Sequence, residues 1–200
     1  YRESSLEAGL KYLLMGAFAS ALLLMGITLA YGLTGSFDFV VLKQALSNLK
    51  PEDYGLAVAA AFLITASIGF KVAMAPFHMW APDVYQAAPA GSAAFLATAT
   101  KVAVFGAAAV SFQRSGLWAV SGVREFVQVL AIASVVVGNL AAAAQRKIRR
   151  IMAYSSVANA GYAGLALSLG APATGSLMLS LVIYGTAVVA AFAMVDVLCK

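Results

Sequence analysis

Residues 54–80 of the chain read YGLAVAAAFLITASIGFKVAMAPFHMW, and this stretch decides the fold class. Up to Lys71 it holds no charged residue, and about 20 mostly apolar residues in a helix span the hydrocarbon core of a bilayer. Pro76 lacks a backbone donor and clashes with the preceding turn, which predicts a kink or break near residues 71–75. Within a membrane such a break is tolerated only where protein or a water-filled cavity satisfies the freed carbonyls. The stretch therefore predicts a broken transmembrane helix that carries Lys71 and His78.

The rest of the chain has the same apolar character. Of its 200 residues 62% are hydrophobic and 10% are charged, whereas soluble domains are about half apolar and about one quarter charged. A soluble helical bundle of this length could not bury so much apolar surface. Further apolar segments cover residues 6–31, 90–112, 126–144, 151–169 and 177–195. The fold class predicted is an all-α membrane protein, a polytopic bundle of about six transmembrane helices of which one is broken at a proline.

The connections between these segments are polar and mostly short. Residues 34–53 predict a loop with a short amphipathic helix over residues 39–49, and residues 81–89, rich in proline and polar groups, predict a turn. Six spans place both ends of the chain on one side of the membrane. Basic residues on that side are Arg2, Arg146, Lys147, Arg149, Arg150 and Lys200, against Lys43, Lys50, Arg114 and Arg124 on the other. Since cytoplasmic loops carry the excess of Lys and Arg, both ends are predicted to be cytoplasmic.

Charge and cysteine content exclude several other classes. The net charge is +5, but the basic residues form no patch with interleaved aromatics, so a nucleic-acid partner is not expected. Cys199 is the only cysteine, which excludes a disulfide within the chain and a thiolate metal cluster. No metal-ligand cluster and no phosphate-binding glycine loop stands out.

Three lone ionisable residues, Lys71, His78 and Lys101, lie within apolar runs. A charge at the bilayer centre costs about 3 kcal/mol on insertion scales, so such residues usually have a function. Low dielectric favours neutral lysine, and histidine titrates near neutrality, so all three could exchange protons at physiological pH. They are candidates for a proton relay. Two simpler interpretations remain open, namely an interfacial His78 beside Trp80 and a structural ion pair for Lys101.

Two other features are less specific. Glu7 and Lys11 are four residues apart in the favourable order on a helix, which fits either an ordinary surface pair or a carboxylate that tunes a lysine. The segment 151–169 is the most polar one, and its Ser, Asn and Tyr side chains could hydrogen-bond between helices or line a hydrated path. On an unbroken helix Lys71 and His78 would share one face.

At these residues the sequence resembles a known family. The run GFKVAMAPFHMWAPDVYQ at residues 69–86 is similar to the signature of the antiporter-like membrane subunits of respiratory complex I. FLATATK at residues 95–101, YSS at residues 154–156 and SLEAGLKY at residues 5–12 match the same family. The resemblance covers nearly the whole chain.

The resemblance implies a fold of two inverted five-helix repeats, with a broken helix in each. Residues 1–200 would be the central part of a single proton-conducting antiporter-like domain, without a separate soluble domain. By motif match Lys71 is the lysine of the first broken helix, His78 the histidine after the break, and Lys101 the central relay lysine. Glu7 and Lys11 match an acidic–basic pair on the preceding helix. The family's partner glutamate for Lys71 would precede Tyr1, and its distal lysine would follow Lys200.

The function implied is proton translocation by a membrane subunit of an NADH-quinone oxidoreductase, driven by quinone reduction elsewhere. This chain would hold no cofactor, and NADH, flavin, iron–sulfur clusters and quinone would be bound by partner subunits. Its partners would be other membrane subunits, lipid, protons and internal water, in a bacterial inner membrane. Two alternatives remain: a subunit of a multisubunit cation/proton antiporter or membrane-bound hydrogenase, and a purely structural membrane scaffold.

Overall fold

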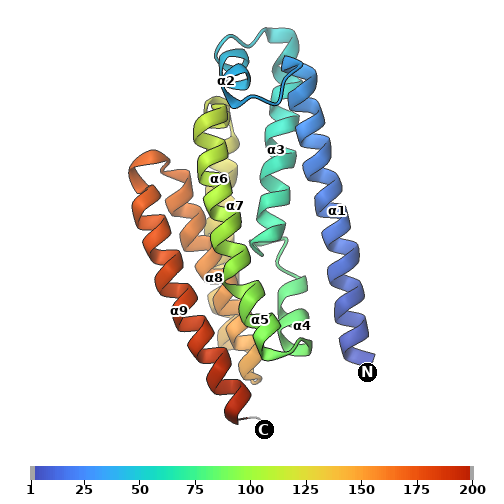
Figure 1. Cartoon of the computed structure of the whole chain (residues 1–200), viewed down its shortest axis with the longest axis vertical. Helices are drawn as coiled ribbons and strands as arrows, with labels where there is room; N and C mark the ends of the chain where they lie inside the picture. The colour runs from blue at the N-terminus through green and yellow to red at the C-terminus, as the bar shows by residue number, and fades with distance from the viewer. Residues whose placement is uncertain (1–2, 199–200) are drawn as a thin grey trace.

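The computed structural model describes residues 3–198, which form a bundle of nine α-helices (Figure 1). No strand occurs within that range, so the all-α prediction is confirmed. Arg2, Cys199 and Lys200, on which predictions of topology and cysteine chemistry rest, lie outside it. The helices are α1 (Glu3–Thr34), α2 (Phe39–Ser47), α3 (Tyr54–Lys71), α4 (Trp80–Ala87), α5 (Ala90–Ala97), α6 (Ala99–Ser115), α7 (Val123–Ala143), α8 (Ile148–Ser168) and α9 (Thr174–Leu198).

Five helical stretches within the described range are long and apolar enough to cross a membrane. They are Ser5–Thr34, Pro51–Lys71, Ala90–Ser115, Val123–Ala143 and Ala171–Val197. The sixth predicted span, α8, is as long as α7 at 21 residues and packs along it. It is less apolar because its buried face carries small and polar residues, Ser156 among them, that contact other helices. The predicted polytopic bundle is confirmed.

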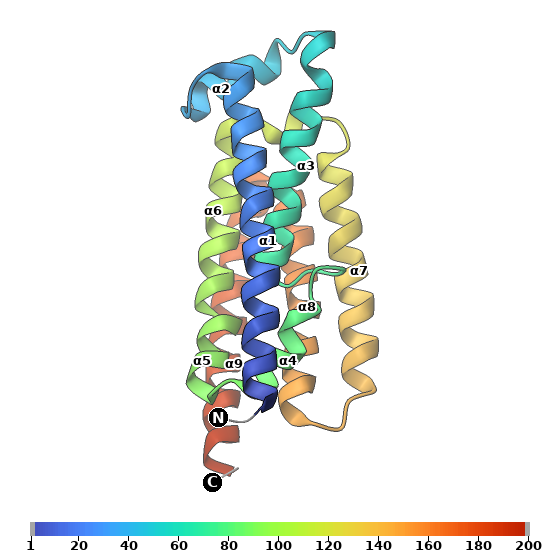
Figure 2. The ribbon, with the colours of Figure 1, turned by 90° about the vertical axis from the view of Figure 1, so that its right-hand side faces the viewer.

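Both ends of the described chain lie at the same end of the bundle (Figure 1). The α7–α8 connection with the basic cluster 146–150 lies there too, and α2 lies at the opposite end (Figure 2). This arrangement agrees with an even number of spans. The cytoplasmic location of the ends stays a prediction.

The predicted break in the second segment is present. Helix α3 ends at Lys71, residues 72–79 are not helical, and the chain resumes as α4. The break is tied to its neighbours, since the amide of Ala75 donates to Ser134 Oγ on α7 at 2.8 Å. In addition, Trp80 Nε1 donates to the carbonyl of Phe70 in the last turn of α3 at 3.1 Å. Protein groups therefore satisfy part of the backbone that the break frees.

The prediction of a turn over residues 81–89 was wrong, because most of that stretch is the helix α4. Pro82 lies in the first turn, where the missing N–H of proline interrupts no helical hydrogen bond. Asp83 also lies in the first turn, where a carboxylate interacts favourably with the helix dipole. The third segment differs as well, since α5 and α6 are separate helices that meet at Thr98.

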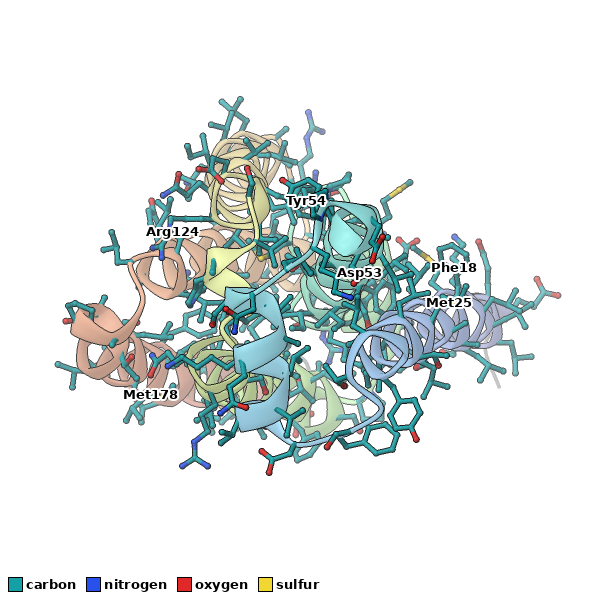
Figure 3. All side chains as sticks on the ribbon, turned by 90° about the horizontal axis from the view of Figure 1, so that it is seen from above. Phe18, Met25, Asp53, Tyr54, Arg124 and Met178 are labelled. Atoms are coloured by element: carbon teal, nitrogen blue, oxygen red, sulfur yellow. The ribbon has the colours of Figure 1, made fainter. Side chains whose placement is uncertain are left out.

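Small residues let α7 and α8 approach closely. A Cβ added to Gly161 would lie 2.6 Å from the carbonyl oxygen of Ala131, and one added to Gly138 would lie 2.6 Å from the nitrogen of Ala158. Helix α1, by contrast, stands at the edge of the bundle, and its side chains such as Phe18 project outward (Figure 3). The tightly packed side of the bundle is therefore the one that holds the centre of α8.

Candidate functional site

Lys101 is the buried cation of the bundle interior. It lies near the middle of the 26-residue stretch Ala90–Ser115, and only 2% of its surface is exposed. Its Nζ donates a hydrogen bond to the backbone carbonyl of Ser156 on α8 and lies 5.7 Å from the centre of the Tyr184 ring on α9. Within residues 3–198 no carboxylate pairs with Lys101. The interhelical ion pair considered for this residue is therefore absent from the described range.

Hydroxyl groups from two further helices surround the same point. The hydroxyl of Ser156, which is fully buried, lies 3.3 Å from Tyr85 Oη on α4. The hydroxyl of Tyr184 is buried and faces Ser156, but it makes no hydrogen bond of standard geometry among the described residues. Lysine has three N–H donors, so Lys101 and Tyr184 both keep hydrogen-bonding capacity.

A small cavity adjoins Lys101 between α6, α8 and α9. Its volume is about 30 Å³, and Lys101, Asn159, Ser180 and Tyr184 contribute its polar lining. A water needs a cavity of roughly 10–15 Å³ and two to four polar partners. The cavity satisfies both conditions, so an internal water could bridge Lys101 to Tyr184.

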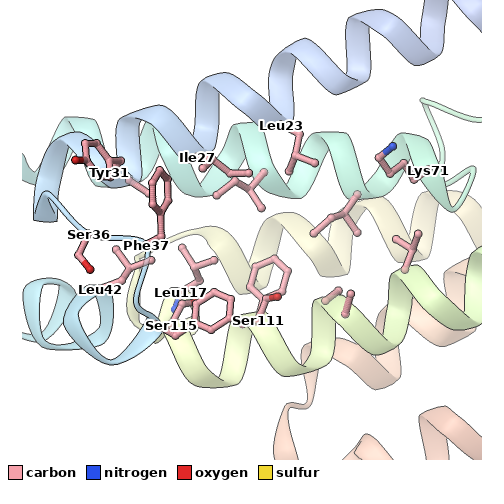
Figure 4. Close-up of a pocket in the computed structure, with 18 of the residues that line it drawn as sticks. Leu23, Ile27, Tyr31, Ser36, Phe37, Leu42, Lys71, Ser111, Ser115 and Leu117 are labelled. Atoms are coloured by element: carbon pink, nitrogen blue, oxygen red, sulfur yellow. The ribbon is translucent and has the colours of Figure 1, made fainter.

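Lys71 lies apart from this cluster, at the end of α3. It is half-buried and lines a mostly apolar groove of about 410 Å³ between α1, α3 and α6. Figure 4 shows Lys71 at one end of the groove and Tyr31 and Phe37 at the other. A second space of about 610 Å³, lined by Ser20 and Thr100 among others, also reaches Lys71. The ammonium group thus faces open space, with no ion pair inside the described range.

His78 lies in the non-helical segment rather than on the helix of Lys71. The prediction that an unbroken helix would place both on one face therefore does not apply, because α3 ends at Lys71. The His78 ring contacts Tyr154 on α8 edge-on, with ring centroids 6.2 Å apart. Its Nδ1 is buried and makes no hydrogen bond of standard geometry within residues 3–198, although the backbone of Pro76 lies close to the ring. The contact with α8 favours an internal over an interfacial position.

Glu7 and Lys11 form an ion pair at the end of the bundle where the chain termini lie, with 2.6 Å between Lys11 Nζ and Glu7 Oε1. Lys11 also binds Asp83 on α4 at 3.2 Å, and Asp83 binds Arg150 on α8 at 3.1 Å. The pair is thus extended into a chain of four charges that joins α1, α4 and α8. Both Glu7 and Lys11 are exposed, so neither lies beside Lys101.

Comparison with known proteins shows which family has this sequence and fold. The family model described as "NADH:quinone oxidoreductase/Mrp antiporter, TM" matches residues 1–199. The chain belongs to this family.

Members of the NADH:quinone oxidoreductase/Mrp antiporter family with similar sequences include NADH-quinone oxidoreductase subunit N of Acinetobacter baumannii. It is 42% identical over 192 residues, which cover 96% of this chain and 38% of the relative. Among solved structures, a chain of respiratory complex I from Thermus thermophilus matches with a TM-score of 0.77 and 42% identity, over 96% of this chain and 40% of that one. The chain thus spans about two fifths of the relatives it matches.

The fold is also found in a chain of more distant sequence. A chain of the Mrp complex from Dietzia matches with a TM-score of 0.84 at 21% identity, over 95% of this chain and 35% of that one. At this identity the likeness concerns the fold alone. The helical fold is therefore what this chain shares with a chain of each complex.

Sequence reasoning found part of the site in this family member and missed the rest. It singled out Lys101 and Ser156, the latter only as one polar residue of its segment. It missed Tyr85, because that stretch was interpreted as a turn, and Tyr184, which lies among apolar residues. Asp83 stood within the quoted motif, and a carboxylate in the first turn of a helix was the available signal. The structure does not gather the five predicted residues into one cluster, and their role in proton transfer stays a prediction.

Proposed function

We propose that this chain is the central stretch of a proton-translocating membrane subunit of an NADH-quinone oxidoreductase, of the subunit N type. The likeness to subunit N and to a chain of complex I, at 42% identity in both cases, supports this assignment. A single observation carries the mechanistic part. Lys101 is almost completely buried at the centre of a membrane-length stretch, and its only protein acceptor within residues 3–198 is a neutral carbonyl.

This environment suits a group that takes up and releases a proton. No carboxylate within residues 3–198 fixes the charge of Lys101, so the side chain can be an ammonium or a neutral amine beside the Ser156 carbonyl. The Ser156 carbonyl can accept a hydrogen bond from either form. An adjoining cavity of about 30 Å³, lined in part by Asn159, Ser180 and Tyr184, gives a water access to the amine. A proton could therefore arrive at and leave Lys101 without creating an unpaired buried anion.

In this proposal the other predicted residues transfer protons between Lys101 and the rest of the path. Lys71 and His78 lie on either side of the break, and Glu7 with Lys11 lies at the end of the bundle near the chain termini. The driving reaction, quinone reduction by NADH through flavin and iron–sulfur clusters, takes place in partner subunits. The membrane is the bacterial inner membrane, with the ends of the chain on the cytoplasmic side.

The test uses the full-length subunit in the assembled, membrane-bound complex. Lys101→Ala is expected to lower proton pumping and coupled quinone reductase activity about tenfold or more, while the complex still assembles. The matched control is Lys50→Ala, since that lysine is 70% exposed and lies outside the helices. Wild-type pumping in Lys101→Ala would refute the proposal and leave the scaffold alternative.

The cation/proton antiporter alternative makes a different prediction. The 21% identity with the Mrp chain supports a shared fold only. In that case membranes that hold the complex would exchange cations for protons without NADH, and Lys101→Ala would abolish this exchange. Measurement of both activities in the same membranes separates the two functions.

A further inference from the structure

Ser156 uses two different atoms to contact two different helices. Its backbone carbonyl accepts a hydrogen bond from Lys101 Nζ on α6, and its hydroxyl is 3.3 Å from Tyr85 Oη on α4. All three residues are buried, with exposed fractions of 0% for Ser156 and Tyr85 and 2% for Lys101. One residue of α8 therefore lies between the buried lysine and the helix that follows the break.

Tyr85 is in turn held by the break itself. Its ring packs edge-on against Trp80 and Phe192, with centroids 6.3 and 6.0 Å apart. Trp80 is the first residue of α4, and its indole N–H binds the carbonyl of Phe70 at the end of α3. A continuous series of contacts thus runs from the end of α3, across the break, through Tyr85 and Ser156, to Lys101.

Aromatic rings packed edge-on in a full core have little freedom to move separately. A shift of α4 relative to α3 would therefore carry the Tyr85 hydroxyl with it. The Ser156 hydroxyl would follow or lose its partner, and the adjoining carbonyl would change its place relative to Lys101. Two elements that each have discrete packing arrangements can be coupled in this way.

We propose that Tyr85 is a positioning residue that, through Ser156, links the arrangement of the broken helix to the place of the Lys101 amine. The inference rests on the proposed function of Lys101 as a proton-exchanging group. Tyr85 itself does not receive the proton in this account. Its hydroxyl fixes Ser156, and Ser156 fixes the acceptor of Lys101.

The titratable and charged groups near this cluster define what a pH measurement would report. Tyr85 faces Ser156 from α4, Lys101 from α6, and Tyr184 from α9. On α7 the titratable residues, Arg124 and Glu125, lie in the first turn, away from the cluster. Lys71 ends α3 and lines a separate groove. Tyr12 of α1 interacts electrostatically with Tyr85, and Tyr162 of α8 lines the cavity beside Lys101. A shift in proton exchange at the cluster would therefore arise from Lys101 and the tyrosines around it.

The experiment compares Tyr85→Phe, Ser156→Ala and the double variant in the full-length complex. Tyr85→Phe keeps the packed ring and removes the hydroxyl contact with Ser156. Ser156→Ala keeps the carbonyl and removes the serine hydroxyl, which faces both Tyr85 and Tyr184. Coupled quinone reductase activity is measured between about pH 6 and 9, where a catalytic proton exchanger acts. Each single variant is expected to lower activity about two- to tenfold, the effect of one typical hydrogen bond. Each should also shift the pH profile, and the double variant should be no worse than either single one.

Matched controls are Ser155→Ala and Tyr54→Phe. They remove the same hydroxyl groups as the test variants, but from exposed side chains outside the cluster. In both test variants the pH profile could keep its shape while the activity falls only in proportion to the amount of assembled complex. That result would mean that Tyr85 acts only in packing, and it would overturn the inference. Additive losses in the double variant would overturn it too. Lys101→Ala is measured in parallel. If it retains full activity the proposed function fails, whereas its loss beside unchanged Tyr85→Phe and Ser156→Ala would reject the positioning role alone.

Discussion

Lys101 on α6 donates a hydrogen bond to the backbone carbonyl of Ser156 on α8, 55 positions further along the chain. As a hydrogen-bond acceptor for a buried lysine, a carbonyl differs from a carboxylate because it carries no charge. When the lysine loses its proton, a carboxylate partner would be left as an uncompensated buried charge, whereas a carbonyl stays neutral. The partner that the fold provides therefore suits repeated protonation and deprotonation.

Lys101→Met should stabilise the subunit while it removes pumping. Methionine keeps the apolar stem of lysine without the amine. The Ser156 carbonyl loses its contact with the amine but stays in the backbone of α8. Burying an amine without an opposite charge costs free energy that an apolar side chain of similar volume avoids, so we expect a gain of about 1 kcal/mol or more. The measurement is unfolding of the purified subunit in denaturing detergent. Lys50→Met, at an exposed lysine, should change the unfolding free energy by less than about 0.5 kcal/mol. A less stable Lys101→Met would show that the amine serves packing.

Lys101 could be predicted from the sequence, whereas Tyr85 could not. A lone charge within an apolar run is visible in sequence because its cost does not depend on the neighbours, and this located Lys101. The partners of Lys101 come from α8 and α9, and Tyr85 of α4 contacts one of them, Ser156. Which of these residues meet depends on helix packing that no local pattern encodes. Proline gave a correct prediction of the break, but the same residue type at Pro82 misled, since proline also begins helices.

Ser134→Ala should loosen the break. The hydroxyl of this fully buried serine accepts the amide of Ala75 at 2.8 Å, and alanine leaves that buried donor without a partner. A buried unsatisfied amide costs about 1–3 kcal/mol. Hydrogen–deuterium exchange at residues 72–79 should become faster, with exchange in α7 unchanged. Thr28→Ala, which removes an exposed hydroxyl bonded within its own turn, is the control. Equal exchange at the break in wild type and Ser134→Ala would contradict this view.

Asp83 and Arg150 should be energetically coupled, because their ion pair at 3.1 Å joins α4 to α8 and both side chains are about one-third exposed. We expect a coupling free energy of about 0.5–1 kcal/mol in a double-mutant cycle of Asp83→Asn and Arg150→Gln. The coupling should decrease at high salt, since solvent-exposed charges are screened. Unfolding of the purified subunit at low and high ionic strength measures both. Lys50 and Glu52, more exposed and 3.7 Å apart, provide a cycle in which little coupling is expected. Strictly additive effects of the two substitutions would show that the pair contributes nothing.

Gly161→Ala should force α7 and α8 apart. The added Cβ would lie 2.6 Å from the Ala131 carbonyl oxygen and 2.8 Å from the backbone nitrogen of Val135, and backbone atoms cannot move aside as a flexible side chain can. Overpacking of this kind costs about 1–3 kcal/mol. Since α8 carries Ser156, displacement of α8 should also lower coupled quinone reductase activity. A clash with only local effects would lower stability but leave this activity unchanged. The matched control is Gly175→Ala, where nothing lies within 4 Å of the new Cβ and the better helix propensity of alanine should stabilise slightly. Unfolding in denaturing detergent and pumping by the assembled complex are measured for both variants, and equal behaviour of the two would show that the α7–α8 contact is not as close as the structure places it.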